Sequence, residues 1–305
     1  MSKKKLNTKK LVLVGTLAVA AGATAYYLNE EHTTYKEKKT AILSKRGTEI
    51  SAVICAPRKI GNYPLVMMLH GFKGDKESTG RFTWLAQTLA NRGIASVRFD
   101  FAGCGESKEP FTSYRMSLAL DDVESVYQYM LDQYKVDPKK VALVGHSMGG
   151  RTCMLFAERH PEIQNVGLLA PAISEGFKGL EDFLGGEEKV KEILELTKTE
   201  KSIHASLSNG MTLDIGAGYF EDMFAYNPLE SMSKYTGNLI YLQGTDDVLV
   251  PPAVSGVALQ NLNPEAKLNY IYLDHVDHSF GSHDQTPEKL EKCMKLVADF
   301  LVSNL

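Results

Sequence analysis

The sequence has few cysteines, and none of them stand at metal-binding spacing. Cys55, Cys104, Cys153 and Cys293 lie far apart and form no CxxC motif. Because a structural zinc site usually needs closely spaced ligand pairs, such a site is not supported. The spacing does not pair these four residues as disulfides either, and we expect four buried thiols.

Basic residues are also scarce beyond the N-terminus. The formal net charge is −3, and no stripe of Lys and Arg follows the first residues. Since phosphate groups are bound by clustered Lys and Arg, nucleic acid is not expected as a partner. No repeat or low-complexity tract is present either. With 44% apolar and 23% charged residues, the chain has an ordinary globular balance and can bury a sizeable core.

The first 28 residues differ from the rest of the chain. Five lysines precede an uncharged run from Leu11 to Leu28, and a polar sequence follows at once. This pattern is typical of an export signal or a membrane anchor. Ala23 and Ala25 suit a cleavage site, but the run is also long enough to span a bilayer, which takes ~17–25 apolar residues. Both interpretations stay open, and both predict that the rest of the chain is exported, outside the cytoplasm.

After this segment, strand patterns alternate with helix patterns. Strands are predicted in residues 48–57, 63–72, 94–107, 141–147, 165–172, 238–247 and 267–280. Helices are predicted in residues 82–93, 117–134, 148–161, 187–201 and 287–305. Several of the strands are continuous apolar runs, which is typical of strands buried on both faces. The alternation predicts an α/β fold, with a mostly parallel sheet and helices on both faces.

The alternation is interrupted from Ile173 to about Lys234, where a charged helix precedes a stretch rich in glycine and aromatic residues. We therefore predict an insertion into one α/β domain. The expected division is a signal or anchor with a polar tether in residues 1–40, and the first part of the domain in 41–172. The inserted cap follows in 173–236, and the second part of the domain in 237–305.

A G-x-S-x-G motif lies between a predicted strand and a predicted helix. Gly145, Ser147 and Gly149 form it. In that context the motif is typical of a nucleophile elbow, a sharp turn that strains the serine backbone and leaves room only for small neighbours. The hydroxyl would then stand clear at the carboxyl edge of the sheet, near the positive end of the following helix. The alternative is a glycine-rich connection whose serine only caps that helix.

A nucleophilic serine needs a base to take its proton. The elbow therefore predicts an acid and a histidine later in the chain, in the order Ser, Asp or Glu, His. Asp246 and Asp247 follow one late predicted strand, and His275, His278 and His283 follow the next. His146, beside the serine, is expected to point away from the hydroxyl and to pack beneath the turn.

With these motifs the chain resembles the α/β-hydrolase family over about residues 50–305. In that family the acid commonly lies in a G-x-x-D-x-x-V-P pattern, which Gly244, Asp247, Val250 and Pro251 match. The resemblance therefore implies Asp247 as the acid, with Asp246 as the alternative. The family's histidine precedes a small residue and a hydrophobic one. This implies His278, with His275 and His283 as alternatives.

The resemblance also implies where an oxyanion would be bound. One donor is the backbone N–H of Met148, the residue after the serine. The other is the backbone N–H of Phe72, which follows His70-Gly71 as the family's donor does. A further family motif, D-x-x-G-x-G-x-S, begins at Asp100 and ends at Ser107, and we interpret it as a structural loop beside the site.

In the order of its motifs the chain is similar to bacterial cinnamoyl or feruloyl esterases, which cleave esters of small aromatic acids. Monoacylglycerol-lipase-like and S33 peptidase-like relatives share most of these motifs. The expected activity is that of a serine carboxylesterase with a small-molecule ester as substrate. Acyl transfer, lipase or peptidase activity of the same fold, and a non-catalytic binding protein, are the alternatives. No metal or organic cofactor is implied.

The cap is expected to cover the substrate pocket. Six of its aromatic residues are candidates to line an apolar site, although the cap's own core is the simpler role for most of them. They are Phe177, Phe183, Tyr219, Phe220, Phe224 and Tyr226.

Overall fold

The computed structural model describes residues 34–58, 61–284 and 287–305. In this part of the chain an eight-stranded sheet has the order β1-β2-β4-β3-β5-β6-β9-β10, and β2 pairs antiparallel with both β1 and β4, whereas the other pairings are parallel. The strands are β1 Tyr35–Leu43, β2 Glu49–Pro57, β3 Tyr63–Leu69, β4 Ala95–Phe99, β5 Val136–His146, β6 Asn165–Leu169, β9 Asn238–Gly244 and β10 Lys267–Leu273. The predicted α/β fold with a mostly parallel sheet is confirmed.

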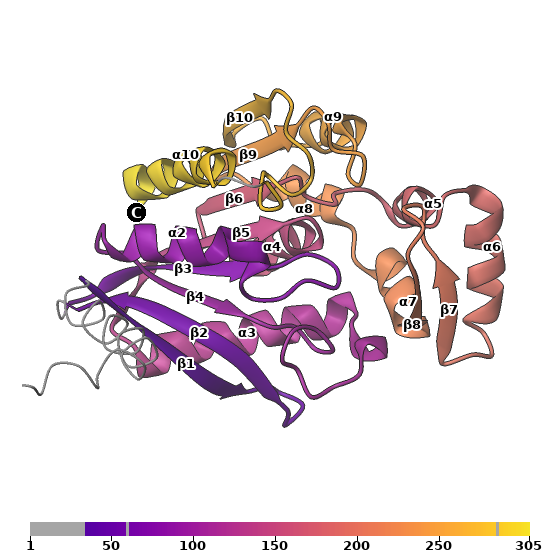
Figure 1. Cartoon of the computed structure of the whole chain (residues 1–305), viewed down its shortest axis with the longest axis horizontal. Coiled ribbons are helices and arrows are strands. Elements are labelled where there is room, and N and C mark those ends of the chain that lie inside the picture. Colours follow the sequence, from indigo (N-terminus) through magenta and orange to yellow (C-terminus); the bar gives the residue numbers. More distant parts are fainter. Residues whose placement is uncertain (1–33, 59–60, 285–286) are drawn as a thin grey trace, which may run out of the picture.

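Helices cover both faces of this sheet (Figure 1). They are α2 Arg81–Ala90, α3 Met116–Gln133, α4 Met148–Arg159, α8 Pro228–Lys234, α9 Pro252–Gln260 and α10 Glu288–Asn304. Short 3-10 turns lie at Ser78–Gly80 and Phe111–Ser113.

The central strand β3 shows why both faces are apolar. Leu65, Met67 and Leu69 belong to the hydrophobic cluster that includes α3 and α4, and Val66 and Met68 belong to the cluster that includes α2 and α10. Because successive side chains of a strand point to opposite faces, a continuous apolar run is what a doubly covered strand requires.

The strand β1 corrects one prediction. Residues 29–40 were expected to form part of a polar tether, but residues 35–40 belong to β1, which pairs antiparallel with β2. Residues 36–39 are all charged and exposed. Charged side chains are common on edge strands, where they discourage further pairing, and here they hide the alternation that identifies a strand.

The other N-terminal predictions concern residues outside the described part. The signal or anchor was predicted in residues 1–28, and the description begins at residue 34. None of the helices in the described ranges has the length and apolar character needed to cross a membrane. The four cysteines are all described, and each is buried and free, as expected.

Residues 173–236 contain a small layer of their own, which lies to one side of the sheet in Figure 1. Its elements are α5 Gly176–Leu184, α6 Glu187–Leu196, the antiparallel hairpin β7 Ser202–Ser206 and β8 Thr212–Gly216, and α7 Ala217–Ala225. Phe220 is fully buried in this layer. The helix α8, which ends the segment, packs against α4.

A buried arginine holds this layer to the body. Arg151 of α4 is completely buried, and its guanidinium donates to the carbonyl oxygens of Ser174 (2.8 Å), Tyr226 (2.6 Å) and Met223 (3.3 Å). Burial lowers the pKa of Arg151 to about 10, which still leaves it charged at neutral pH. A cation on α4 therefore binds segments near both ends of the insertion.

A second connection joins α7 to the start of α3. Asp222 accepts two hydrogen bonds from the Arg115 guanidinium, at 2.9 and 2.6 Å, and one from the backbone N–H of Ser117 at 2.7 Å. The neighbouring Glu221 lies 3.6 Å from the same guanidinium, but its side chain is 58% exposed.

We expect Asp222→Ala to lower the free energy of unfolding by about 2 kcal/mol, since it leaves the partly buried Arg115 without its bidentate partner. Urea unfolding followed by circular dichroism measures this loss. Glu221→Ala is the matched control, and it should change stability by less than about 0.5 kcal/mol, as for an exposed ion pair. Equal losses in the two variants would contradict the assignment.

Candidate active site

Ser147 lies at the turn between β5 and α4 and has a strained backbone, with φ 57° and ψ −121°. The surroundings enforce this conformation. A side chain at Gly149 would collide with the backbone carbonyl of Leu69, and one at Gly145 would collide with the backbone carbonyl of Gly149. The predicted strained turn with obligatory small neighbours is therefore present. Ser147 is the N-cap residue of α4 and lines a cavity at this end of the sheet.

Asp247 and His278 come together beyond the carboxyl ends of β9 and β10. The Nδ1 atom of His278 lies 2.7 Å from Oδ2 of Asp247. The other carboxylate oxygen accepts hydrogen bonds from the backbone N–H groups of Leu249 (3.0 Å) and Val250 (2.8 Å). Asp247 is buried, so these bonds fix both of its oxygens. The carboxylate thus orients the imidazole and leaves Nε2 as the ring atom available for proton transfer.

The alternative residues do not join this pair. The side chain of Asp246 is 56% exposed and that of His275 is 83% exposed, and they lie 3.7 Å from each other at the surface. His283 is exposed as well. The geometry therefore distinguishes neighbouring residues that the sequence left open.

Buried polar groups form a chain of hydrogen bonds that ends at Asp247. The Gln243 amide donates to Oδ2 of Asp247 at 3.4 Å and to the Val250 carbonyl at 3.1 Å. Its own oxygen accepts from the Ser255 hydroxyl at 2.7 Å, and that hydroxyl lies 3.0 Å from the hydroxyl of Tyr241. No sequence motif marks Gln243 or Ser255, because a single amide and a serine within a helix are common in any protein.

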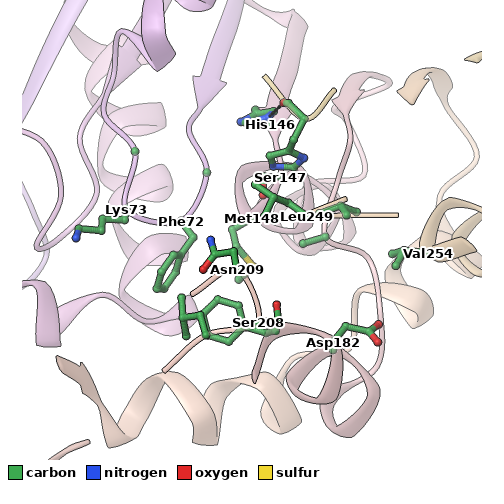
Figure 2. A pocket seen from close by; sticks show the side chains of 18 of the residues that line it. Phe72, Lys73, His146, Ser147, Met148, Asp182, Ser208, Asn209, Leu249 and Val254 are labelled. Atoms are coloured by element: carbon green, nitrogen blue, oxygen red, sulfur yellow. Dashed lines mark hydrogen bonds between the residues drawn. The ribbon is translucent and has the colours of Figure 1, made fainter. Parts of the chain in front are cut away.

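Ser147 and His278 line one cavity of about 420 Å³. Figure 2 shows Ser147, Met148 and Leu249 close together, with Phe72 to the left of Met148. Phe72 and Met148, whose backbone N–H groups are the predicted oxyanion donors, both line this cavity.

The neutral His70 side chain forms hydrogen bonds that hold the loop carrying Phe72 in place. It is fully buried, and burial lowers its pKa. Its Nδ1–H donates to the Gly71 carbonyl at 2.8 Å, and its Nε2 accepts from the backbone N–H of Phe101 at 3.1 Å. These two partners require one tautomer, which links the loop to the end of β4.

The loop beginning at Asp100 is structural, as interpreted from its motif. The buried Asp100 carboxylate accepts from the backbone N–H of Lys76 (2.7 Å) and of Glu106 (3.0 Å), and from the Lys76 ammonium group (2.6 Å). A side chain at Gly105 would collide with this carboxylate. The motif thus connects its own loop to the loop after β3, which lines the cavity.

His146 has a role that sequence reasoning missed. It is buried beneath the turn, as expected, but its ring packs against His278 with 4.5 Å between centroids. Its Nε2–H donates to the His278 backbone carbonyl at 2.9 Å. Arg81 of α2 completes this support, since it donates to the Ser279 carbonyl at 2.6 Å and lies 3.4 Å from Nδ1 of His146.

Arg81 is itself buried, and burial lowers its pKa to about 10. Burial and the nearby Arg81 charge lower the pKa of His146 well below its usual range. The backbone of the His278 loop is therefore held by a neutral imidazole and a cation. No sequence signal marks Arg81, because its partners at the site, the Ser279 carbonyl and His146, lie far from it in the chain.

The candidate aromatic residues of the cap divide into two groups. Phe183 and Tyr219 line the cavity, and their rings lie 5.1 and 5.5 Å from the ring of Phe72. The other four do not line it: Phe220 is in the core, Phe177 and Phe224 are largely exposed, and Tyr226 lies outside the lining.

A family model described as serine aminopeptidase, S33 matches residues 63–189. Among curated proteins, monoacylglycerol lipase abhd6-B of Xenopus laevis is 31% identical over 117 residues, which cover 37% of this chain and 32% of that protein. The matches to the curated relatives span only about a third or less of their length.

Solved structures match over most of the chain. Est1E from Butyrivibrio proteoclasticus, solved with ferulic acid bound, aligns with a TM-score of 0.71 at 21% identity and covers 87% of this chain and 98% of its own. A monoacylglycerol lipase of Paleococcus ferrophilus aligns with a TM-score of 0.65 at 19% identity, covering 84% of this chain and all of its own. At these identities the likeness concerns the fold.

We expect the free energy of unfolding to decrease as pH falls below ~6.5, because the unfolded chain then takes up protons that buried His146 and His70 exclude. Each such histidine contributes up to ~1.4 kcal/mol per pH unit, in the interval between its folded pKa and its unfolded pKa. Urea unfolding between pH 5 and 8 should show a smaller slope for His146→Gln.

The matched control for this slope is His204→Gln. The His204 side chain is 71% exposed, so its removal should leave the pH dependence of stability unchanged. A slope reduced equally in both variants, or in neither, is incompatible with a buried neutral His146.

Proposed function

The chain is an α/β hydrolase by fold, and from this premise we propose that it is a serine carboxylesterase acting through an acyl-enzyme. The observation that carries the proposal is that His278, paired with Asp247, lines the same cavity as the strained Ser147. Fold alone does not imply an activity, so the argument rests on this arrangement of side chains and backbone donors.

In the proposed mechanism His278 removes the Ser147 proton as Oγ attacks the ester carbonyl carbon. The negative charge that develops on the carbonyl oxygen is stabilised by the backbone N–H groups of Phe72 and Met148, and by the N-terminal end of α4. His278 then gives its proton to the departing alkoxide, which leaves as the alcohol.

Water completes the proposed cycle. His278 removes a proton from a water molecule, the resulting oxygen attacks the acyl carbon, and collapse returns the proton to Ser147 with release of the carboxylic acid. Asp247 stays ionised throughout and stabilises the imidazolium form of His278. A small-molecule ester is therefore the proposed partner of the site.

The cavity walls suit an apolar substrate. Phe72, Phe183 and Tyr219 form a cluster of aromatic rings on one side of the catalytic cavity. This is compatible with the aryl esters suggested by the resemblance to cinnamoyl and feruloyl esterases. It also favours hydrolysis of apolar esters over cleavage of charged peptides, which is the alternative named by the S33 family description.

Residues 1–28 add a separate proposal from sequence alone. Their lysines and apolar run suggest that the chain is exported, so that the hydrolase domain acts outside the cytoplasm, either anchored or released.

The direct experiment is hydrolysis of p-nitrophenyl butyrate by the full chain, the Ser147→Ala variant and a Ser303→Ala control. Ser303 lies on α10, and its hydroxyl bonds only within that helix. We expect Ser147→Ala to lower kcat by at least ~10³-fold and the control to match the parent. Equal rates in all three proteins would falsify the proposal, and product analysis with added alcohols or amines separates hydrolysis from acyl transfer.

A second prediction concerns the acid. Asp247→Asn presents an amide to Nδ1 of His278 and so favours the wrong imidazole tautomer, which should lower kcat by ~10³–10⁴-fold with a smaller effect on KM. Asp246→Asn, one residue away and exposed, should remain within about threefold of the parent. Steady-state kinetics with the same ester measures both, and a larger loss in Asp246→Asn would reverse the assignment.

A further inference from the structure

A second cavity of about 760 Å³ adjoins the catalytic cavity. The two share Leu249, Pro251 and Val254 on the side of the body, and Ser208 and Asn209 on the side of the cap. Figure 2 shows Leu249 and Val254 on one side of this junction and Asp182 and Ser208 below it. A group bound at Ser147 can therefore extend past Leu249 into the second space.

The walls of the two cavities differ in chemistry. The catalytic cavity contains the aromatic rings of Phe72, Phe183 and Tyr219. In the described part of the chain, the second cavity is lined by no aromatic ring. Its apolar wall is aliphatic and includes Ile173, Leu229, Val248, Leu249, Val254 and Val257. Such a wall suits a flexible hydrocarbon chain, whereas flat rings are better matched by the aromatic walls of the first cavity.

Several of these aliphatic side chains are exposed to water. Val248 is 85% exposed, Leu249 is 50% exposed and Val257 is 46% exposed. Val248 and Leu249 belong to the loop after Asp247 and Val257 belongs to α9, and all three line the second cavity. Neighbouring exposed apolar side chains at a cavity are typical of a surface that a ligand covers, because covering them releases ordered water.

The position of Leu249 follows from the chemistry of the site. The backbone N–H groups of Leu249 and Val250 both donate to Asp247, which fixes the path of the loop. The same hydrogen bonds that hold the acid therefore place Leu249 at the junction of the two cavities. This couples the reacting centre to the second cavity through one short segment.

The charged residues of the second cavity do not suit an anionic ligand. Lys178 is the single cation of its lining among the described residues, and its ammonium group lies 2.8 Å from Asp182 and 3.2 Å from Glu181. Glu175 adds a further negative charge to the lining. A carboxylate or phosphate would meet net negative charge there, whereas an uncharged chain would meet the aliphatic wall.

We propose that the second cavity binds an uncharged aliphatic chain of the ester, so that reactivity increases with the length of that chain. This inference rests on the proposed esterase function and specifies its substrate class. Either half of an ester can carry the chain, as the acyl group or as the alkoxy group. The experiment therefore varies the two halves separately.

In the first arm, kcat/KM is measured for p-nitrophenyl acetate, butyrate, hexanoate and octanoate. In the second arm, methyl, butyl, hexyl and octyl butyrate are hydrolysed under pH-stat titration of the released acid. All substrates are kept below the concentration at which they aggregate. We expect kcat/KM to rise about two- to fourfold per added CH₂ in one series, the factor that corresponds to burying one methylene.

Variants locate the effect. Val257→Asp places a carboxylate in the second cavity. In the series whose kcat/KM rises with chain length, it should reduce the ratio of kcat/KM for the eight-carbon substrate to kcat/KM for the shortest substrate by at least tenfold. Val302→Asp is the matched control, because Val302 is a similarly exposed valine (39%) on the distant helix α10. Its ratio should equal that of the parent. Val254→Phe narrows the junction of the two cavities without adding a charge, and the same ratio of kcat/KM values is measured for it.

The possible failures are distinguishable. If hydrolysis depends on Ser147 but kcat/KM is flat or falls with length in both series, the inference is overturned and the esterase proposal stands. A length dependence that is retained in both Val257→Asp and Val254→Phe also overturns it. If no ester is hydrolysed in a Ser147-dependent manner, the proposed function fails and the inference fails with it.

Discussion

The site depends on one crowded turn. Ser147 has a positive φ because the chain must turn within a single residue from β5, which pairs with β3, into α4. The carbonyl of Leu69 occupies the space that a side chain at Gly149 would need. Strain of this kind costs of order 1–3 kcal/mol and persists only where the surrounding packing enforces it. Here the apolar sheet, covered on both faces, supplies that packing, so the core and the Ser147 turn are parts of one arrangement.

Two buried arginines bind segments near this turn, and each donates to backbone carbonyl or hydroxyl oxygens rather than to carboxylates. Arg81 holds the segment after His278, and Arg151 holds both ends of the inserted cap. Desolvation of a guanidinium is costly, and Arg tolerates it better than Lys because its charge is delocalised over several donors. Each arginine thus connects the region of the Ser147 turn, through direct hydrogen bonds, to a segment distant in sequence.

Much of the fold could be predicted because its signals are local. The apolar run at 63–72 and the amphipathic helix at 117–134 correspond to β3 and α3. Other elements carried weaker signals. The strand β1 has four consecutive charged residues, the cap hairpin has strands of only five residues, and the helix α9 has small or apolar residues on most sides. In such segments periodicity cannot identify the element, because tertiary pairing and packing decide it.

By itself, the sequence determined the elbow and the doubly covered sheet, since these depend on spacing within a few residues, whereas Asp247 and His278 were implied by the resemblance to a family. Only the tertiary structure decided that His278 meets Asp247 rather than Asp246, that His146 supports the same loop, and that two cavities join at Leu249. The physical reason is that neighbouring residues along the chain are nearly equivalent in pattern. What differs between such neighbours is which side chain is buried where the loops after β9 and β10 meet. That meeting is made by contacts between residues far apart in the chain.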